Sequence, residues 1–302
     1  MRLVTFRDPN HQPRAGWIQG SGVVDMSLAS DGRLPTDILT FIRDHEKYMD
    51  IIRSFNLTDS EPHYSLDQVT LLAPLPHPPS VRDFAAFETH VKNATERSGQ
   101  SVPKEWYEIP VFYFSNHQAI MGPEEPIPRP KNCRRLDYEL EMACVIGKQG
   151  RNIKAEEAED YIFGYTIFND WSARDLQFQE MKVNLGPAKG KDFAISIGPY
   201  LVTKDELEQY RTHDRYDLKM MARINGKMVS EGNFKDIYYT FGQMIERASQ
   251  DVTLYPGDII GSGTVGYGCL LELGEEVHRW LEPGDVVELE ITGLGVLRNP
   301  II

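Results

Sequence analysis

Two glutamates separated by one residue, Glu139 and Glu141, interrupt an otherwise apolar run of the sequence. The β-branched and aromatic residues around them alternate in the way that predicts a β-strand. Because residues i and i+2 share a face of a strand, both carboxylates are expected on one face, with Tyr138, Leu140 and Met142 on the other. Two ionised carboxylates this close repel each other, so the pair predicts either a bound divalent cation or a strand face open to water.

Two further carboxylates could complete such a cation site. Asp170 follows an apolar segment, in the string Asn-Asp-Trp-Ser-Ala-Arg-Asp at 169–175, and Asp83 precedes a segment at 84–96 with helical spacing. Each of the two also fits an ordinary helix cap. Four oxygen donors from separate elements are the ligand set that Mg2+, Mn2+ or Ca2+ requires.

Two residues are candidates for acid–base chemistry. His90 stands seven residues after Asp83, about two helical turns, so both could face one side of a helix; a surface histidine is the alternative. Glu272 lies in an apolar run expected to be a strand, where a lone carboxylate needs a partner unless it points outward from an edge.

Two glycine-rich segments could contact a substrate. The segment at 185–193 is also basic, but no serine or threonine follows its lysine, so a nucleotide-binding P-loop is not expected. We expect it instead to deliver Lys191 to an anionic or carbonyl substrate. The segment at 261–268 could offer backbone N–H groups to a carboxylate, or could be a plain turn.

The elements that must position these residues divide the chain in two. Short strands and two helices predict a small N-terminal domain at 1–70, and a proline-rich joint at 71–79 leads into a second domain at 71–302. The expected helices of the second domain lie at 84–96, 155–161, 170–181 and 236–249. Many short strands without regular βαβ alternation, and a hairpin signal at Asn225-Gly226, predict an α+β, mostly β fold with a closed or rolled sheet and helices outside it.

Composition excludes several classes of partner. The formal net charge of −13 argues against binding to nucleic acid or to anionic membranes, and no apolar run has the length of a membrane span. The chain starts without the layout of a secretory signal. Its three cysteines, Cys133, Cys144 and Cys269, have no zinc-site spacing and are expected to be buried in a protein of the cytoplasm.

Together, these motifs resemble the ordered motifs of the fumarylacetoacetate hydrolase family. The resemblance covers about residues 75–302 and is carried by Asp83 with His90, Glu139 with Glu141, the string at 169–175, the loop at 185–193, and Gly263-Thr264 followed by Leu271-Glu272. The N-terminal 70 residues resemble the small leading domain of longer family members.

The resemblance implies a role for each residue. Asp83, Glu139, Glu141 and Asp170 would bind Mg2+, Mn2+ or Ca2+. His90 would activate water and Glu272 would orient it. Lys191 would polarise a substrate oxygen or help to stabilise the carbanion of the leaving group. The substrate contacts would come from Tyr113, Arg174, Gln177 and Thr264.

It also implies a fold and an activity. The fold would be a mixed β-sandwich or β-roll with peripheral helices, commonly assembled as a homodimer. The activity would be metal-dependent hydrolysis of a C–C bond in a diketo acid of fumarylacetoacetate or acylpyruvate type, as in aromatic amino-acid catabolism. Decarboxylation of oxaloacetate or another β-keto acid, isomerisation of a hydroxymuconate-type diacid, and ligand binding without catalysis are the alternatives.

Two positions depart from the family pattern. Met181 replaces a substrate-binding tyrosine of the fumarylacetoacetases, and Gly99, with Arg97 close by, replaces an arginine. These positions recognise the distal part of the substrate, so the sequence leaves the natural substrate open.

Overall fold

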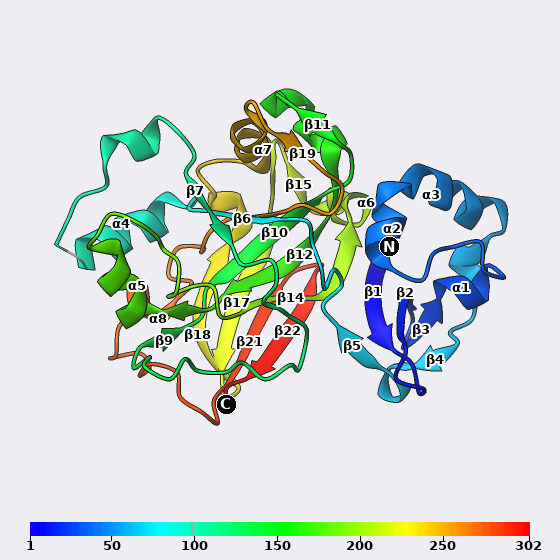
Figure 1. Ribbon diagram of the computed structural model, residues 1–302, viewed down its shortest axis with the longest axis horizontal. Coiled ribbons are helices and arrows are strands. Elements are labelled where there is room, and N and C mark those ends of the chain that lie inside the picture. Colours follow the sequence, from blue (N-terminus) through cyan, green and yellow to red (C-terminus); the bar gives the residue numbers. More distant parts are fainter. Residues whose placement is uncertain (98) are drawn as a thin grey trace.

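A twelve-stranded sheet is the largest part of the computed structural model, which describes residues 1–97 and 99–302 (Figure 1). Its strands are β1 (Arg2–Arg7), β2 (Pro13–Gln19), β3 (Gly22–Asp25), β4 (Tyr64–Ser65), β5 (Thr70–Leu72), β6 (Val81–Phe84), β7 (Phe112–Ser115), β8 (Ile120–Met121), β10 (Leu140–Ile146), β12 (Ile162–Asp170), β14 (Ile195–Thr203) and β20 (Ile259–Gly261). Neighbours follow the order β4-β3-β2-β1-β14-β12-β10-β20-β6-β7, with β5 paired to β1 and β8 to β14. The α+β, sheet-rich fold class is therefore confirmed. The described strands do not close into a ring, so a closed sheet is not confirmed.

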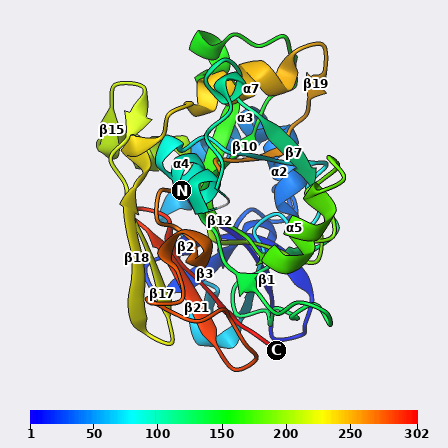
Figure 2. The same ribbon diagram turned by 90° about the vertical axis from the view of Figure 1, so that its left-hand side faces the viewer.

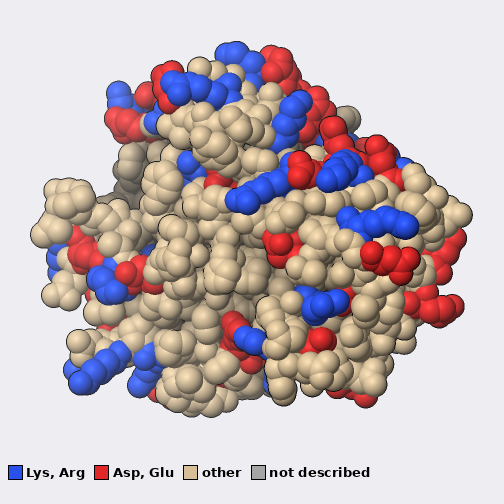
Figure 3. Space-filling view, turned by 45° about the vertical axis from the view of Figure 1, so that its right-hand side comes forward, with Lys and Arg blue, Asp and Glu red and all other residues tan. Residues whose placement is uncertain are grey.

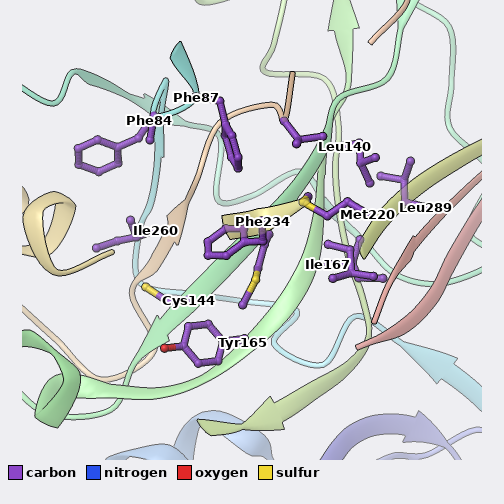
Figure 4. Packing of buried hydrophobic residues seen from close by; sticks show 14 of the residues in the cluster. Phe84, Phe87, Leu140, Cys144, Tyr165, Ile167, Met220, Phe234, Ile260 and Leu289 are labelled. Atoms are coloured by element: carbon purple, nitrogen blue, oxygen red, sulfur yellow. The ribbon is translucent and has the colours of Figure 1, made fainter. Parts of the chain in front are cut away.

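A four-stranded sheet packs against this large sheet. It consists of β17 (Lys219–Ile224), β18 (Lys227–Asn233), β21 (Val286–Ile291) and β22 (Gly295–Pro300), in the order β18-β17-β21-β22. The hairpin predicted at Asn225-Gly226 joins β17 to β18, and both turn residues have positive φ, as a two-residue hairpin turn requires. Met220 and Leu289 of this sheet join Ile167 of β12 in one buried apolar cluster (Figure 4).

Short strand pairs and helices complete the fold. The pairs are β9 (Leu136–Asp137) with β13 (Ser172–Ala173), β11 (Gly150–Arg151) with β19 (Thr253–Leu254), and β15 (Arg211–Thr212) with β16 (Arg215–Tyr216). The α-helices are α1 (Met26–Ala29), α2 (Ile38–Arg43), α3 (His45–Ser54), α4 (Glu88–Arg97), α5 (Arg174–Met181), α6 (Lys204–Leu207), α7 (Phe241–Ser249) and α8 (Leu270–Leu273). The 3-10 helices are η1 (Leu57–Asp59), η2 (Leu66–Gln68), η3 (Lys104–Tyr107), η4 (Ala155–Tyr161), η5 (Glu208–Tyr210) and η6 (Phe234–Asp236).

The N-terminal 70 residues contribute four strands of the large sheet and the helices α1 to α3, drawn in blue in Figure 1. Helix α2 begins after Asp37, whose side chain accepts the backbone N–H of Thr40 at 2.8 Å. β1 pairs antiparallel with β14, so one sheet runs from the leading segment into the rest of the chain. The domain boundary at residue 70 stays a prediction.

Strand β10 lies in the middle of the large sheet and is buried along its whole length. Leu140 and Met142 pack into the cluster shown in Figure 4, while Ala143 and Val145 on the opposite face pack into a second cluster shared with the N-terminal segment. Glu141 shares its face with Ala143 and Val145, as the two-residue period requires. The predicted division of this segment into two faces is therefore confirmed.

Three predicted positions in the elements were wrong. Asp83 lies inside strand β6 rather than capping a helix, and α4 begins five residues later. Asp170 is the last residue of β12, and α5 begins at Arg174. Glu272 lies on the short helix α8 rather than on a strand. A polar residue before helical spacing fits both a cap and a strand end, and only the tertiary pairing distinguishes them.

The surface and the cysteines agree with the composition. In the described part of the chain no helix has the length and apolar character needed to cross a membrane. Lysine and arginine are interspersed with aspartate and glutamate on the face in Figure 3. All three cysteines are buried and free of disulfide bonds, as predicted.

Candidate active site

The four predicted metal ligands meet at one end of neighbouring strands. Asp170 ends β12, Glu139 directly precedes β10, Glu141 is the second residue of β10, and Asp83 lies near the end of β6. Since β10 runs antiparallel to both β12 and β20, and β20 runs parallel to β6, these strand ends coincide in space. The topology brings together four carboxylates that are up to 87 residues apart in the sequence.

These carboxylates are not on a solvated face. Glu139 is 5% exposed and Glu141 is fully buried, which rules out the interpretation in which both side chains see water. One oxygen each of Asp83 and Asp170, Oδ1 in both residues, is buried without a hydrogen-bond partner. Buried carboxylate oxygens without partners are costly unless a cation or a proton compensates them.

The donor set fits a divalent cation. Ligand oxygens of Asp83, Glu139 and Glu141 lie within 4.8 Å of one another, and Asp170 faces the same group. A Cβ on Gly261 would stand 2.5 Å from Asp83 Oδ1, so glycine at this position leaves room beside the carboxylates. An all-oxygen set of this kind suits Mg2+, Mn2+ or Ca2+ rather than zinc.

Burial and the repulsion between neighbouring carboxylates shift the pKa values of these groups. Burial raises the pKa of Asp83 and of Glu141 well above the ordinary carboxyl value, and the neighbouring carboxylates raise it further. Burial alone would also raise the pKa of Glu139, but the positive charges of Lys191 and Arg174 outweigh it and hold that pKa below its usual range. A cation at this point would replace protons on the first two groups.

Lys191 and Tyr113 reach the same carboxylates from the side. Lys191 Nζ donates to Glu139 Oε2 and to Asp170 Oδ2, both at 2.6 Å, and these charges raise the lysine pKa although burial opposes them. The hydroxyl of Tyr113 on β7 contacts Asp83 Oδ2 at 3.0 Å and also Asp170 Oδ2. Lys191 therefore stays protonated and holds its charge beside the cluster.

His90 and Glu272 form a second pair. His90 Nδ1 lies 2.6 Å from Glu272 Oε1. The other oxygen of Glu272 accepts from Asn93 Nδ2 at 2.9 Å and from the backbone N–H of Tyr267 at 2.8 Å. Burial would raise the pKa of Glu272, but its interaction with His90 and these hydrogen bonds lower that pKa overall, so the carboxylate stays ionised.

Asp137 is a buried residue that sequence reasoning missed. It accepts from Arg174 Nε at 2.9 Å and from the backbone N–H groups of Leu270 and Leu271 at 2.7 and 3.0 Å. Because Arg174 also donates to Glu139 Oε1 at 2.8 Å, Asp137 links the carboxylate cluster to the helix that carries Glu272. The signal was the position of Asp137 two residues before Glu139, where a third carboxylate continues the alternation.

One cavity of about 400 Å³ joins the two groups. Nine of the predicted site residues line it: Asp83, His90, Tyr113, Glu139, Glu141, Arg174, Gln177, Lys191 and Thr264. The other two, Asp170 and Glu272, stand directly behind lining residues, in contact with Lys191 and His90. The helices α4 and α5 flank the strand ends at this site (Figure 2).

A family model described as fumarylacetoacetate (FAA) hydrolase C-terminal matches residues 80–302, the range that contains every one of these residues. The chain belongs to the fumarylacetoacetate hydrolase family. The resemblance inferred from the motifs is thereby confirmed, and the chain is an enzyme of this superfamily.

Relatives of known name span the whole chain. The oxaloacetate tautomerase fahd2, mitochondrial, of Xenopus laevis is 34% identical over 307 residues, covering 100% of this chain and 90% of the frog protein. Family members thus include proteins whose named reaction is tautomerisation.

Solved structures of the family have the same fold. The fumarylacetoacetate hydrolase of Exiguobacterium antarcticum matches with a TM-score of 0.73 and 27% identity, covering 100% of this chain and 99% of that one. The 5-carboxymethyl-2-hydroxymuconate delta-isomerase of Mycobacterium smegmatis matches with a TM-score of 0.70 and 26% identity, with the same coverage. The family fold therefore supports both hydrolases and isomerases.

The two departures from the family pattern lie in different places. Met181 lines the cavity, whereas Gly99 is exposed and outside its lining. The nearby Arg97 donates to the backbone oxygen of Glu272 at 2.8 Å and to Glu276 at 3.5 Å. Arg97 thus supports the helix behind His90 and does not line the cavity.

Proposed function

We propose that this enzyme hydrolyses a C–C bond in diketo acids of the acylpyruvate or fumarylacetoacetate type, with a divalent cation. The observation that carries the proposal is the 2.6 Å contact between His90 Nδ1 and Glu272 Oε1, in a histidine that lines the cavity of the carboxylates. An ionised carboxylate on Nδ1 fixes the tautomer and leaves Nε2 as the nitrogen that accepts a proton.

The reaction on an acylpyruvate begins with water. His90 Nε2 takes one proton from the water, whose oxygen attacks the C4 carbonyl. The C3–C4 bond breaks, its electron pair moves to C3 as the enolate of pyruvate, and the acyl group leaves as a carboxylic acid. His90 returns the proton to C3, so one water molecule is consumed for each bond cleaved.

The charged residues stabilise the developing enolate. Lys191 remains protonated among its carboxylate partners, so it acts as a fixed positive charge rather than as a proton donor. A divalent cation held by Asp83, Glu139, Glu141 and Asp170 would supply Lewis-acid stabilisation of the enolate oxygen.

The second candidate is keto–enol tautomerisation of oxaloacetate, the activity that names the frog relative. It needs His90 to take a proton from C3 but requires no attack by water. The identity over the entire chain favours this candidate, and the residues that stabilise an enolate serve both reactions.

Isotopic water separates the two reactions. The Mg2+- or Mn2+-loaded enzyme is incubated with acylpyruvates, fumarylacetoacetate and oxaloacetate in water enriched in oxygen-18. We expect pyruvate or acetoacetate to be released and the label to enter the other carboxylic acid. Accelerated incorporation of deuterium at C3 of oxaloacetate in a parallel incubation in deuterated water, without cleavage of any diketo acid, would favour the tautomerase instead.

The variant His90→Ala distinguishes hydrolysis from decarboxylation. Hydrolysis is expected to collapse by about 10²-fold or more, because the base is lost. Decarboxylation of a β-keto acid, which requires no activated water, would persist in part and would be seen as release of carbon dioxide.

The homodimer implied by the resemblance stays a prediction, which light scattering on the purified protein would test.

A further inference from the structure

The cavity of the proposed active site has a charged side and an apolar side. The carboxylates come from the ends of β6 and β10, whereas the apolar side comes from α4, α5, α8 and the segment before β7. These helices lie together beside the strand ends (Figure 1). The apolar lining residues are Val91, Val111, Phe178, Met181 and Leu271.

No cation is available at the apolar side within the described residues. Among the described residues, the lysine and arginine side chains that line the cavity are Lys191 and Arg174, both on its charged side, and each is held by two buried carboxylates at 2.6 to 2.9 Å. The polar residues near the apolar side are neutral. Of these, Gln177 accepts a hydrogen bond from Arg174 Nη1 at 3.2 Å, Thr95 donates its hydroxyl to the backbone oxygen of Val91 at 2.8 Å, and Gln100 is exposed.

We propose that the substrate carries an uncharged, apolar substituent at the end remote from its keto-acid head. This inference rests on the proposed function and makes the substrate an acylpyruvate with an alkyl or aryl chain rather than a diacid. A second carboxylate placed against this side would lose its hydration without gaining a partner, which is strongly unfavourable. An alkyl chain would instead bury apolar surface against Phe178 and Leu271.

Met181 is the lining residue that best tests this specificity. It ends α5 at the cavity and is 46% exposed, so a longer polar side chain can be placed there without disturbing the core. Arginine at this position would bring a guanidinium to the apolar side, where it could pair with a carboxylate.

A matched pair of substrates tests the proposal. The kcat/KM of the Mg2+-loaded enzyme is measured for 2,4-dioxooctanoate, which ends in a methyl group, and for 2,4-dioxooctanedioate, which ends in a carboxylate at the same chain length. We expect a preference for the methyl-ended acid of at least about tenfold. In Met181→Arg we expect the preference to fall by about tenfold or to reverse.

The control is Val252→Arg, which adds the same charge at a side chain of equal exposure, 46%, outside the cavity. It should leave the substrate ratio unchanged. Equal or better cleavage of the diacid by the unmodified enzyme overturns the proposal, as does an equal effect of the two arginine variants.

Binding separates this proposal from the proposed function. Calorimetry on the Mg2+-loaded enzyme compares N-butyl oxamate with N-(3-carboxypropyl) oxamate, which have the same head and differ only at the remote end. If neither diketo acid is cleaved, the proposed hydrolysis fails, and tighter binding of N-butyl oxamate still supports the apolar substituent. Equal or tighter binding of the carboxylated compound overturns it.

Discussion

At the scale of single residues, the pair of His90 and Glu272 combines hydrogen bonding with charge. Glutamine at position 272 would keep the shape of the side chain and much of its hydrogen bonding, but would remove the negative charge that stabilises a protonated histidine. Loss of this negative charge should therefore lower the rate of the reaction more than the affinity for substrate.

We predict that Glu272→Gln lowers kcat by about 10²-fold or more and changes KM little. Steady-state kinetics on the metal-loaded enzyme measure both constants. Glu276→Gln is the control, because Glu276 is exposed and its contact with Arg97 at 3.5 Å is weak. A kcat in Glu272→Gln equal to that of the unmodified enzyme would contradict the role proposed for the pair.

Most of the residues that meet at the cavity could be named from the sequence, because their types and order follow the family motifs, while their chemical roles stay predictions. Which of these side chains reach the cavity surface and which lie behind it could not be predicted. Asp170 and Glu272 lie one layer behind Lys191 and His90, and this layering depends on side-chain contacts between distant segments. Asp137 was not predicted, although it stands two residues before Glu139 and so continues the alternation of carboxylates in the sequence.

At the scale of elements, the helix α8 is too short to hold its own position. It has four residues, and Asp137 accepts two of its first backbone N–H groups while also binding Arg174. A helix of one turn gains little from its internal hydrogen bonds, so this external acceptor should determine where Glu272 lies.

We predict that Asp137→Asn lowers the free energy of unfolding by about 3–5 kcal/mol, because it leaves Arg174 buried with one ionic partner fewer. Urea denaturation measures this change. Asp217→Asn serves as the control, since Asp217 pairs with Lys235 on the surface and should cost at most about 1 kcal/mol. Equal losses in the two variants would contradict a special role for Asp137.

The element types around the site were harder to predict than the residues. The segment at 81–84 is short and contains Arg82 and Asp83, so its sequence resembles a helix start as much as a strand. Its strand character comes from pairing with β20 and β7, which no local pattern records. The longer β12 is buried along its whole length, and its apolar residues before Asp170 were visible in the sequence as an apolar segment.

At the scale of the whole molecule, a cation bound by the buried carboxylates would change the stability of the fold. Asp83, Glu141 and Asp170 have raised pKa values in the folded protein, with burial as the first cause. Without a cation, their contribution to stability is present at low pH and is lost as the pH rises through the raised values. The lowered pKa of Glu139 acts in the opposite direction, but only at lower pH.

We predict that the rise in Tm produced by Mg2+ or Mn2+ grows between about pH 5 and pH 8, because the cation binds the ionised carboxylates and releases their protons. Thermal denaturation with the cation and with a chelator measures the difference at each pH. Glu141→Gln, which removes one of the proposed ligands, should reduce the difference throughout. A difference that is constant with pH, or largest at pH 5, would contradict the prediction.

The division of the molecule into two domains is the feature that the sequence predicted from a proline-rich joint alone. Across that joint, β1 pairs with β14. Phe41 and Ile42 of α2 also share a buried cluster with Phe163 of β12, the strand next to β14 in the sheet. The ring of Phe41 contacts that of Phe163 edge-on, with centroids 6.2 Å apart. These contacts should make the N-terminal segment unfold together with the rest of the chain.

We therefore predict that Phe41→Ala lowers the free energy of unfolding by about 3–5 kcal/mol and destabilises both parts alike. Hydrogen exchange in a urea series, followed on peptides from β2 and from β12, should give one common midpoint that shifts to lower urea. Phe55→Ala is the matched control, because Phe55 belongs to the same segment but is 52% exposed, so its loss should shift the midpoint far less. If the β2 peptide alone moved to a lower midpoint while the β12 peptide kept its own, the first 70 residues would be a separate unit of folding, and the shared sheet would connect two domains without coupling them.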